Sequence, residues 1–309
     1  MKRMICVVLA LVFIFLSGCT NVKPAATDGY TFTDALGREV TVTSHEKVAA
    51  ALGSFGEVWM LAGGTLTAVT SDAWSERAFE LPDTVEDLGL YTEPSVERVI
   101  ALGCDLMLLS TGKQEHIALL DQLTAAGVNC VYFSVETFDD YLAMLKTCTE
   151  ITGRYDLYEQ NGLSVRARID DAIEKANEHP SPSVLLIRAF STGAKAKGSD
   201  NMTGRMLRDL NCTNIADSDD SLLEDLSLEA IIKADPDFIF VVTMGSSPAA
   251  ALEALDRTLL SNPAWSGLTA VREGRYHVLP KDLFHYKPNA RWGESYEIIE
   301  RILYENEEN

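Results

Sequence analysis

Short apolar runs that alternate with helix-like segments constrain the fold of this chain more than any other feature of its sequence. Continuous apolar runs of this length are typical of strands that helices cover on both faces, because both sides of each strand must then be apolar. The pattern predicts an α/β fold with mainly parallel sheets. The runs are residues 48–52, 66–70, 106–110, 128–133, 184–187, 238–244 and 276–279. Before them, residues 30–42 alternate apolar with polar and predict a β-hairpin that turns around Leu36 and Gly37.

One long segment between the two groups of strands has no strand pattern. From Ile151 to Ala176 its apolar residues recur at spacings of three and four, which is the spacing of one face of a helix. A helix over 156–177 would be about 33 Å long at ~1.5 Å per residue, and the prolines just beyond it would end it. We therefore expect two α/β lobes, 30–150 and 180–309, joined by one linker helix within 151–179. The second lobe should end in a C-terminal helix.

The sequence repeats itself once in each predicted lobe. Residues 95–109 read SVERVIALGCDLMLL and residues 227–241 read SLEAIIKADPDFIFV. Aligned without a gap, both begin with Ser, an apolar residue and Glu, and both continue with an apolar pair, an Asp and an apolar strand. In each, the Ser can cap a helix and the Glu favours the positive end of the helix dipole. The match indicates two related lobes rather than two unrelated helix–strand units.

The N-terminus has the pattern of a secretory signal. Lys2 and Arg3 precede an apolar run over 5–16 that is too short to cross a bilayer. The run ends in a Leu-Ser-Gly-Cys sequence that finishes at Cys19 and matches a bacterial lipobox. We expect a signal peptide at 1–18, acylation of Cys19 and a polar tether over 19–29. The mature protein would then be extracytoplasmic and anchored by lipid to the bacterial cell membrane.

The full chain carries a net charge of −20. Such a surface repels nucleic acid and anionic lipid headgroups, so nucleic acid is excluded as a partner and only the anchor should contact the membrane. The cysteines beyond the anchor form no Cys-x-x-Cys pair and do not cluster with the histidines, so no disulfide is predicted and a bare metal-ion site is disfavoured. They are Cys104, Cys130, Cys148 and Cys212, and the histidines are His45, His116, His179, His277 and His285.

With the lipobox, the hairpin sequence TDALGREV at 33–40, the paired Ser-x-Glu helices and the single helical linker, the chain resembles the helical-backbone substrate-binding proteins of ABC importers. That family serves ferric siderophores, haem and cobalamin, and the likeness covers nearly the whole mature chain. The resemblance implies a monomer with a shallow ligand cleft between its lobes, little hinge motion and no cofactor of its own. It also implies that Glu97 and Glu229, one in each repeat, pair with arginines of a transmembrane permease. The chain departs from the family at Gly103-Cys104, where Pro usually precedes Asp, as in Asp235-Pro236-Asp237.

The loops beyond the carboxyl ends of the strands are where an open α/β sheet binds ligand. Residues 280–292 read PKDLFHYKPNARW and concentrate aromatic and cationic side chains in an otherwise acidic chain. Flat apolar faces with a few cations suit a large anionic metal complex. His285, Tyr91 or Met244 could also ligate haem iron, although a lone residue of these types is more often structural. The predicted ligand-binding residues are Ser54, Trp74, Tyr91, Lys113, Arg188, His285, Lys287, Arg291 and Trp292.

The sequence thus predicts a protein that captures an iron complex (a ferric siderophore or haem) or cobalamin and delivers it to the permease. The alternatives are an exported, hydrolase-like α/β enzyme and a bare-metal-ion binding protein, with a surface adhesin as a third class. No enzyme is expected, because the sequence lacks Gly-x-Ser-x-Gly, Walker A, Gly-x-Gly-x-x-Gly and His-Glu-x-x-His patterns. The sequence does not choose among the ligands.

Overall fold

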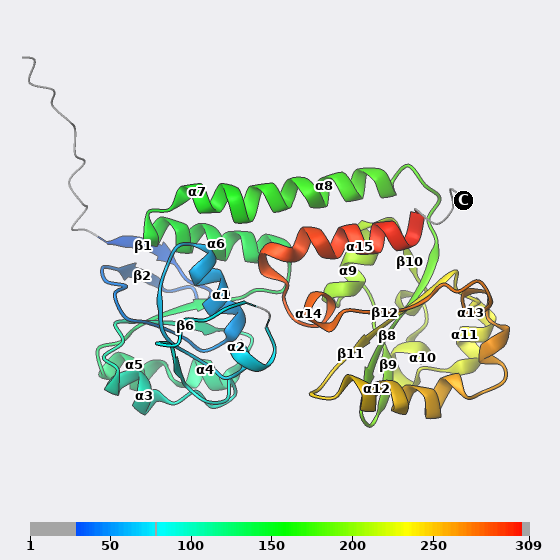
Figure 1. The fold of residues 1–309 in the computed structure, drawn as a ribbon, viewed down its shortest axis with the longest axis horizontal. Helices are drawn as coiled ribbons and strands as arrows, with labels where there is room; N and C mark the ends of the chain where they lie inside the picture. The colour runs from blue at the N-terminus through cyan, green and yellow to red at the C-terminus, as the bar shows by residue number, and fades with distance from the viewer. Residues whose placement is uncertain (1–28, 78, 305–309) are drawn as a thin grey trace, which may run out of the picture.

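The computed structural model describes residues 29–77 and 79–304. Within these residues the chain forms two α/β lobes that lie side by side, with a long helical segment running across both (Figure 1). The predicted signal peptide at 1–18, Cys19 and the predicted tether up to residue 28 lie outside the described residues. In the part of the chain that the structure describes, no helix has the length and apolar character needed to cross a membrane.

The first lobe is built on a five-stranded parallel sheet with helices on both faces. Its strands are β3 (Val48–Ala50), β4 (Leu66–Val69), β5 (Glu86–Asp87), β6 (Leu106–Ser110) and β7 (Asn129–Phe133), and its helices are α1 (Gly53–Leu61), α2 (Asp72–Ser75), α3 (Val96–Ala101), α4 (Gln114–Ala118), α5 (Leu120–Ala125) and α6 (Phe138–Thr152). The strand order is β5-β4-β3-β6-β7. Leu106 and Leu108 of the interior strand β6 pack in the cluster that contains α1 and α6, whereas Met107 and Leu109 pack in the cluster that contains α3 and α5. Burial on both faces explains why this strand is a continuous apolar run.

The second lobe repeats this architecture with one antiparallel addition. Its strands are β8 (Ser183–Phe190), β9 (Gly193–Ala196), β10 (Thr213–Asn214), β11 (Phe238–Thr243) and β12 (Tyr276–Leu279), and its helices are α9 (Met202–Asp209), α10 (Asp220–Asp225), α11 (Leu228–Ala234), α12 (Pro248–Leu255), α13 (Thr269–Arg272), α14 (Lys281–Phe284) and α15 (Trp292–Tyr304). The path β10-β8-β11-β12 is parallel, and β9 pairs with β8 in the antiparallel sense. The predicted α/β class with mainly parallel sheets is confirmed.

The predicted hairpin is present as β1 (Tyr30–Thr33) and β2 (Glu39–Val42), paired antiparallel. Asp34 is buried at the turn, where its carboxylate accepts from the backbone N–H groups of Leu36 and Arg38 and from the Arg38 guanidinium. The same guanidinium donates to the carbonyl oxygen of Cys130 at 2.8 Å. This turn therefore ties the hairpin to β7, the edge strand of the first sheet.

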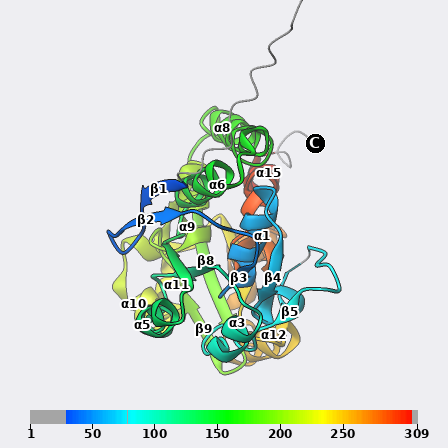
Figure 2. The same cartoon turned by 90° about the vertical axis from the view of Figure 1, so that its left-hand side faces the viewer.

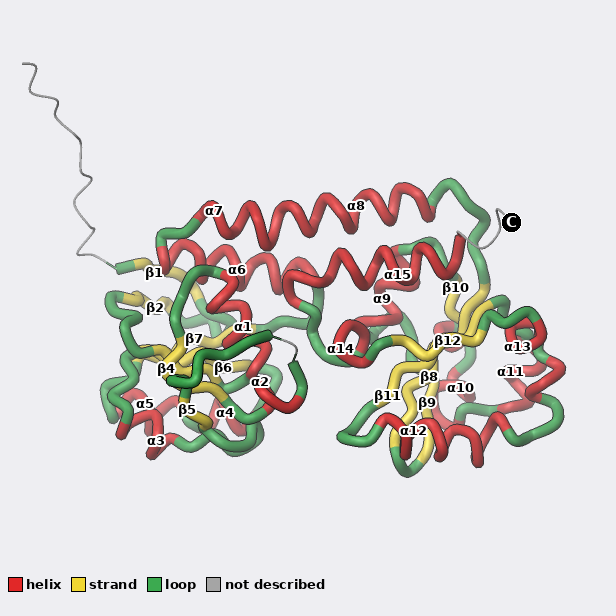
Figure 3. The backbone as a smooth tube through the Cα atoms, viewed as in Figure 1, coloured by secondary structure: helices red, strands yellow, loops and turns green. Residues whose placement is uncertain are grey.

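A helical connection crosses from the first lobe to the second, as predicted. It consists of α7 (Tyr155–Tyr158), a π-helical turn (Glu159–Leu163) and α8 (Ser164–Ala176). In Figures 2 and 3 this connection lies with α6 and α15 on one side of both sheets. Arg168 of α8 makes two 2.7 Å hydrogen bonds to Glu297 of α15, and Gly293 of α15 lies against the Arg168 side chain. The linker is thus the outer member of a packed helix layer, which stiffens it further.

The sequence repeat is also a repeat in three dimensions. β6 and β11 begin at matching positions, directly after Asp105 and Asp237. Asp105 accepts hydrogen bonds from the backbone N–H groups of Glu46 and Lys47, which precede β3. Asp237 accepts hydrogen bonds from the backbone N–H and the hydroxyl of Ser183, at the start of β8. Because β3 and β8 are the parallel neighbours of β6 and β11, each aspartate aligns the beginnings of two adjacent strands.

The four cysteines of the two lobes are all buried and unpaired. Burial raises the pKa of the Cys104 and Cys130 thiols to about 11 and that of Cys212 to about 12, and it raises the pKa of Cys148 as well. They behave as small apolar core residues and are protonated at neutral pH.

Candidate functional site

A cleft of about 340 Å³ lies between the two lobes. Its walls are made by segments that follow the carboxyl ends of β3, β4, β5, β6, β11 and β12, which is where an open α/β sheet presents its ligand-binding loops. The lining residues are Leu52, Ser54, Asp72, Glu76, Arg77, Tyr91, Lys113, Met244, Gly245, Ser246, His285, Tyr286 and Lys287.

The first lobe contributes a tyrosine and a lysine that contact each other. The Lys113 ammonium lies 4.9 Å from the centre of the Tyr91 ring. The Tyr91 loop is held from below by the buried His116, whose Nε2 donates to the Tyr91 carbonyl oxygen at 2.7 Å and whose Nδ1 accepts from the Ser110 backbone N–H at 3.2 Å. Burial lowers the pKa of His116, so this ring is neutral and both of its nitrogens are satisfied. His116 is a supporting residue that the sequence did not reveal, because nothing in its local pattern distinguishes it from an exposed helix residue.

The second lobe contributes an equivalent pair. The Lys281 ammonium lies 4.5 Å from the centre of the Tyr286 ring and donates to the Gly245 carbonyl oxygen at 2.6 Å. His285, between them in sequence, has a buried Nδ1 with no hydrogen-bond partner in the described part of the chain. Burial, aided by the nearby Arg188 and Lys281 charges, lowers the pKa of His285 to about 4. The His285 ring is therefore neutral at physiological pH.

The base of the cleft is held by a polar cluster that joins the two lobes. Glu57 of α1 accepts from the Arg77 guanidinium and, at 2.8 Å, from the Asn289 amide. Asn289 also donates to the Ser54 carbonyl oxygen at 3.0 Å, and Arg77 donates to the Lys287 carbonyl oxygen at 2.7 Å. Asn289 is buried in a left-handed conformation, with φ +51°. These contacts fix the segment after α14 against the first lobe. No motif in the sequence predicts this cluster, because its members lie far apart in the chain.

The charges in the cleft are unequally compensated. Arg77 is neutralised by Glu57, and Lys287 lies 3.5 Å from Glu136. Lys113 and Lys281 make no ion pair within the described residues. On the acidic side, Asp72 accepts from the Thr70 hydroxyl and the Gly53 backbone N–H, and burial raises the pKa of its carboxyl group. The cleft therefore presents the unpaired charge of Lys113, with that of Lys281 beside it, in a chain whose net charge is −20.

Of the predicted ligand-binding residues, the structure brings five together. Ser54, Tyr91, Lys113, His285 and Lys287 all line the cleft, as does Met244, which was considered as a haem ligand. Arg188 is half-buried on β8 behind this wall and acts on His285 through its charge rather than by lining the cleft. Trp74 lies on α2 with 47% of its surface exposed and does not line the cleft.

Two expectations for the segment 280–292 are corrected. Arg291 does not line the cleft: its guanidinium is bound to Asp282 at 2.7 Å and to both carboxylate oxygens of Glu294 at 2.7 and 2.9 Å. Trp292 is only 2% exposed and packs edge-on against Phe138 of the first lobe, with ring centres 6.1 Å apart. The aromatic and cationic residues gathered there serve two purposes. His285, Tyr286 and Lys287 line the cleft, whereas Arg291 and Trp292 anchor the start of α15.

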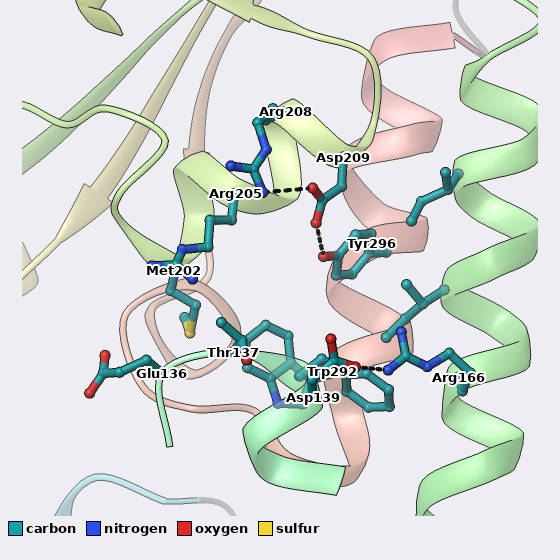
Figure 4. A pocket seen from close by; sticks show the side chains of 13 residues that line it. Glu136, Thr137, Asp139, Arg166, Met202, Arg205, Arg208, Asp209, Trp292 and Tyr296 are labelled. Carbon is teal, nitrogen blue, oxygen red and sulfur yellow. Dashed lines mark hydrogen bonds and ion pairs between the residues drawn. The ribbon is translucent and has the colours of Figure 1, made fainter. Parts of the chain in front are cut away.

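Trp292 faces a separate hollow of about 330 Å³ beneath the linker helix. Figure 4 shows this hollow between α8, α9, α15 and the start of α6. Its charged residues are largely paired with one another: Arg166 with Asp139, and Asp209 with both Arg208 and the Tyr296 hydroxyl. We take it to be a gap between the lobes beneath the linker, because internal ion pairs satisfy most of its charges.

The two glutamates predicted to contact a permease are exposed in the first turns of α3 and α11. In each helix the preceding serine is the N-cap: Ser95 accepts from the Arg98 backbone N–H and Ser227 from that of Ala230. The capping prediction is confirmed for both repeats, and docking through Glu97 and Glu229 stays a prediction. In the described residues, no group of three or more His, Cys, Asp or Glu side chains could hold a metal ion.

Comparisons with known proteins give a consistent result. The family model described as periplasmic binding protein matches residues 48–283. The Bacillus subtilis protein named "Probable siderophore-binding lipoprotein YfiY" is 24% identical over 294 residues, covering 87% of this chain and 89% of that protein. The match to "Putative ABC transporter substrate-binding lipoprotein YhfQ" of the same organism is 25% identical and spans 63% of this chain and 62% of that protein. Staphylococcus aureus SirA, crystallised with staphyloferrin B, has a similar fold, with a TM-score of 0.67 at 18% identity over 89% of this chain and 97% of that one.

Proposed function

The chain belongs to the periplasmic binding protein family, and we propose that it is the substrate-binding lipoprotein of an ABC importer that captures an anionic ferric complex. The observation that carries this proposal is a pair of lysines without ion-pair partners among the described residues: Lys113 lines the cleft, and Lys281 lies beside it, against the lining residues Tyr286 and Gly245. The names of its relatives support an iron complex as the cargo, since they include a siderophore-binding lipoprotein and an Fe(3+)-citrate-binding protein.

The electrostatic argument concerns both attraction and orientation. A protein with a net charge of −20 repels an anionic ligand at long range, so binding requires local positive charge that internal carboxylates do not cancel. Lys113 of the first lobe supplies it in the wall of the cleft, and Lys281 of the second lobe supplies it beside the cleft, where its ammonium contacts Tyr286 and Gly245. Each ammonium lies over the ring of a tyrosine that lines the cleft, and a ligand oxygen would form a stronger charge-assisted hydrogen bond than this cation–π contact.

The cleft also supports haem as a second candidate ligand. Tyr91, Met244 and His285 line one cavity, and His285 stays neutral with an unpartnered Nδ1. A neutral imidazole is the form that ligates iron. The tyrosine faces would then flank the flat macrocycle.

Delivery to the membrane forms the second half of the proposal. Acylation of Cys19 would hold the protein at the outer face of the cell membrane as a monomer, and Glu97 and Glu229 would pair with cations of the permease. The exposed first-turn positions of both glutamates support this role. We expect binding without turnover, in keeping with a family of binding proteins.

The visible absorption spectrum of the full chain purified from its native host tests the ligand class. A siderophore charge-transfer band supports the ferric complex, a Soret band supports haem, and corrinoid bands support cobalamin. Tryptophan-fluorescence titration with ferric citrate, a ferric catecholate, a ferric hydroxamate and haemin then ranks affinities. Failure of all four to bind, together with a bare spectrum, would remove the capture function.

Variants of the two lysines locate the ligand. Lys113→Ala and Lys281→Ala should each weaken binding of an anionic complex by about 1–3 kcal/mol, because each removes one charge-assisted bond. Arg291→Ala is the matched control, since the Arg291 guanidinium is held by two carboxylates outside the cleft. The dissociation constant of this variant for the anionic complex should equal that of the wild type. A larger loss for Arg291→Ala than for the two lysine variants would move the ligand to another surface.

A further inference from the structure

Each of the two predicted docking glutamates has an exposed isoleucine beside it. Ile100 follows Glu97 by three residues, and Ile232 follows Glu229 by three residues, so each pair lies on one face of its helix. The exposed fractions are 43% for Ile100 and 42% for Ile232. Both isoleucines also occupy the same position of the sequence repeat.

Packing of the core does not explain why these two side chains are apolar, because both are exposed. The core-facing position of each helix is already filled by the preceding residue, Val99 or Ile231, and both of those are fully buried. A β-branched side chain loses rotamer freedom in a helix, so an exposed isoleucine there lowers helix stability as well as solubility. A single exposed apolar residue is ordinary. Its recurrence at the equivalent point of both lobes needs another explanation.

The other exposed large apolar side chains of the described residues do not recur in this way. Among Trp74, Leu90, Tyr155, Leu163, Leu223, Met244 and Val278, none falls within the repeated segments 95–109 and 227–241. The isoleucine pair is therefore a property of the repeat, as the glutamate pair is.

We propose that Ile100 and Ile232 are the apolar anchors of the permease-docking surface, each inserting beside the ion pair made by its neighbouring glutamate. This inference rests on the proposed function. A partner that matches this surface has two equivalent binding sites, each with an arginine or lysine next to an apolar recess. Two equivalent transmembrane subunits would provide such a pair of sites. α3 and α11 lie toward the outer parts of the two lobes (Figure 1), so one copy of the partner surface would meet each lobe.

Magnitudes favour a mixed surface over glutamates alone. An exposed ion pair changes an association constant by only about fivefold or less, because water screens it and the side chains lose freedom. An apolar neighbour that is buried on docking excludes water from the pair and adds the free energy of its own burial. The negative charge of the whole chain supplies attraction toward a basic partner but no fixed register. The isoleucines would supply the apolar burial and the fixed register that the glutamates alone do not provide.

The importer is first identified in the native host, as the protein that cross-links to a photo-reactive amino acid placed at position 100. It is then reconstituted in nanodiscs, and binding of the full lipidated chain to it is measured. Ile100→Gln and Ile232→Gln keep a good helix former of similar length. Each should weaken binding to the importer roughly tenfold, as expected for loss of a half-exposed isoleucine from an interface, and the two should be equal. Leu163→Gln is the matched control, because Leu163 is also 42% exposed but lies on the linker, and it should bind like the wild type.

The possible results separate this inference from the proposed function. Weaker docking of both isoleucine variants, with unchanged binding of the ferric complex and unchanged melting temperature, supports the anchors. If Glu97→Ala with Glu229→Ala prevents docking while the isoleucine variants dock normally, the anchors are wrong and the proposed function stands. If the wild type does not bind the importer, or the double glutamate variant binds it normally, the docking half of the proposed function fails first.

Discussion

In the first lobe the chain turns from α3 into β6 through Gly103, at φ +67°, and in the second lobe it turns from α11 into β11 through Asp235, at φ +43°. These two residues are equivalent in the repeat, and both adopt a left-handed conformation that most side chains avoid. Glycine adopts it without strain. Asp235 retains a side chain there and hydrogen-bonds to the backbone N–H and hydroxyl of Thr269, at 2.8 and 2.7 Å.

The difference shows that the backbone path is the feature shared by the two lobes, while the residues that achieve it vary. Gly103 occupies the position of Asp235 without loss of the turn, since Asp105, two residues later, still aligns β6 with β3, as Asp237 aligns β11 with β8. The departure from the family pattern at Gly103-Cys104 therefore leaves the strand, and with it the position of Glu97, unchanged. Variants in the two units test how far this equivalence extends.

The largest effect is expected at the docking positions. Replacing both Glu97 and Glu229 with alanine should lower uptake of the iron complex about 100-fold or more, because docking would then leave a partner cation buried and unpaired beside each isoleucine, which costs more than the loss of an exposed ion pair. The two single variants should be equally defective if the lobes dock equivalently. Uptake of ⁵⁵Fe-labelled complex by cells measures the effect, and fluorescence titration of the purified double variant should give the wild-type dissociation constant. Loss of ligand affinity in the double variant would show that these glutamates contribute to ligand binding, and that their assignment to the docking surface is wrong.

Strand alignment should be the next most sensitive feature. Asp105→Ala leaves the backbone N–H groups of Glu46 and Lys47 without their acceptor, and Asp237→Ala does the same to the backbone N–H and hydroxyl of Ser183. Each change should lower the unfolding free energy by about 1–3 kcal/mol. Urea unfolding followed by circular dichroism measures both values. If only one of the two variants lowers the unfolding free energy, the aspartate of the other lobe does not stabilise the alignment of its two strands.

The sequence predicted these shared features well, and the reason is local. Continuous apolar runs, the Ser-x-Glu caps and the helical linker, which spans 155–176 and contains a π-helical turn, each depend on residues close together in the chain. The antiparallel β9 was missed because Gly193–Ala196 has no apolar run and forms only by pairing with β8.

The cleft was predicted less completely, since its support comes from residues far apart in sequence. Asn289 reaches Ser54 and Glu57, and His116 holds Tyr91, through contacts that no spacing reveals. The prediction that Arg291 and Trp292 bind the ligand rests on residues 280–292 forming one loop. The structure divides that segment at Pro288, after which Asn289–Arg291 and α15 are helical.

A smaller effect on the unfolding free energy is expected from substitutions at Gly103 and Asp235, the left-handed residues of the two turns. A Cβ atom at Gly103 would meet only the Lys47 ammonium, at 3.6 Å, so Gly103→Ala tests the left-handed backbone alone and should cost about 1–2 kcal/mol. Asp235→Gly relieves the same strain but loses both bonds to Thr269, so its net cost should be below about 1 kcal/mol. Thermal and urea unfolding compare them. An equal cost for both would show that strain is negligible at Asp235 or that its hydrogen bonds contribute more than we expect.

The smallest expected effect is a pH dependence confined to the second lobe. The hydrogen bonds from Thr269 lower the pKa of Asp235 in the folded protein. A carboxyl group with a lowered folded pKa contributes stability at pH values above its unfolded pKa of about 3.9, and this stability is lost as the pH falls through the folded pKa. Because Asp235 is exposed, the contribution should be only a few tenths of a kcal/mol. The unfolding free energy of Asp235→Asn should therefore approach that of the wild type between pH 5 and pH 3, whereas the cost of Gly103→Ala should stay constant over that range, since glycine and alanine carry no titrating group. A cost of Gly103→Ala that also changed with pH would mean that the turn itself, and not the Asp235 carboxylate, responds to protonation.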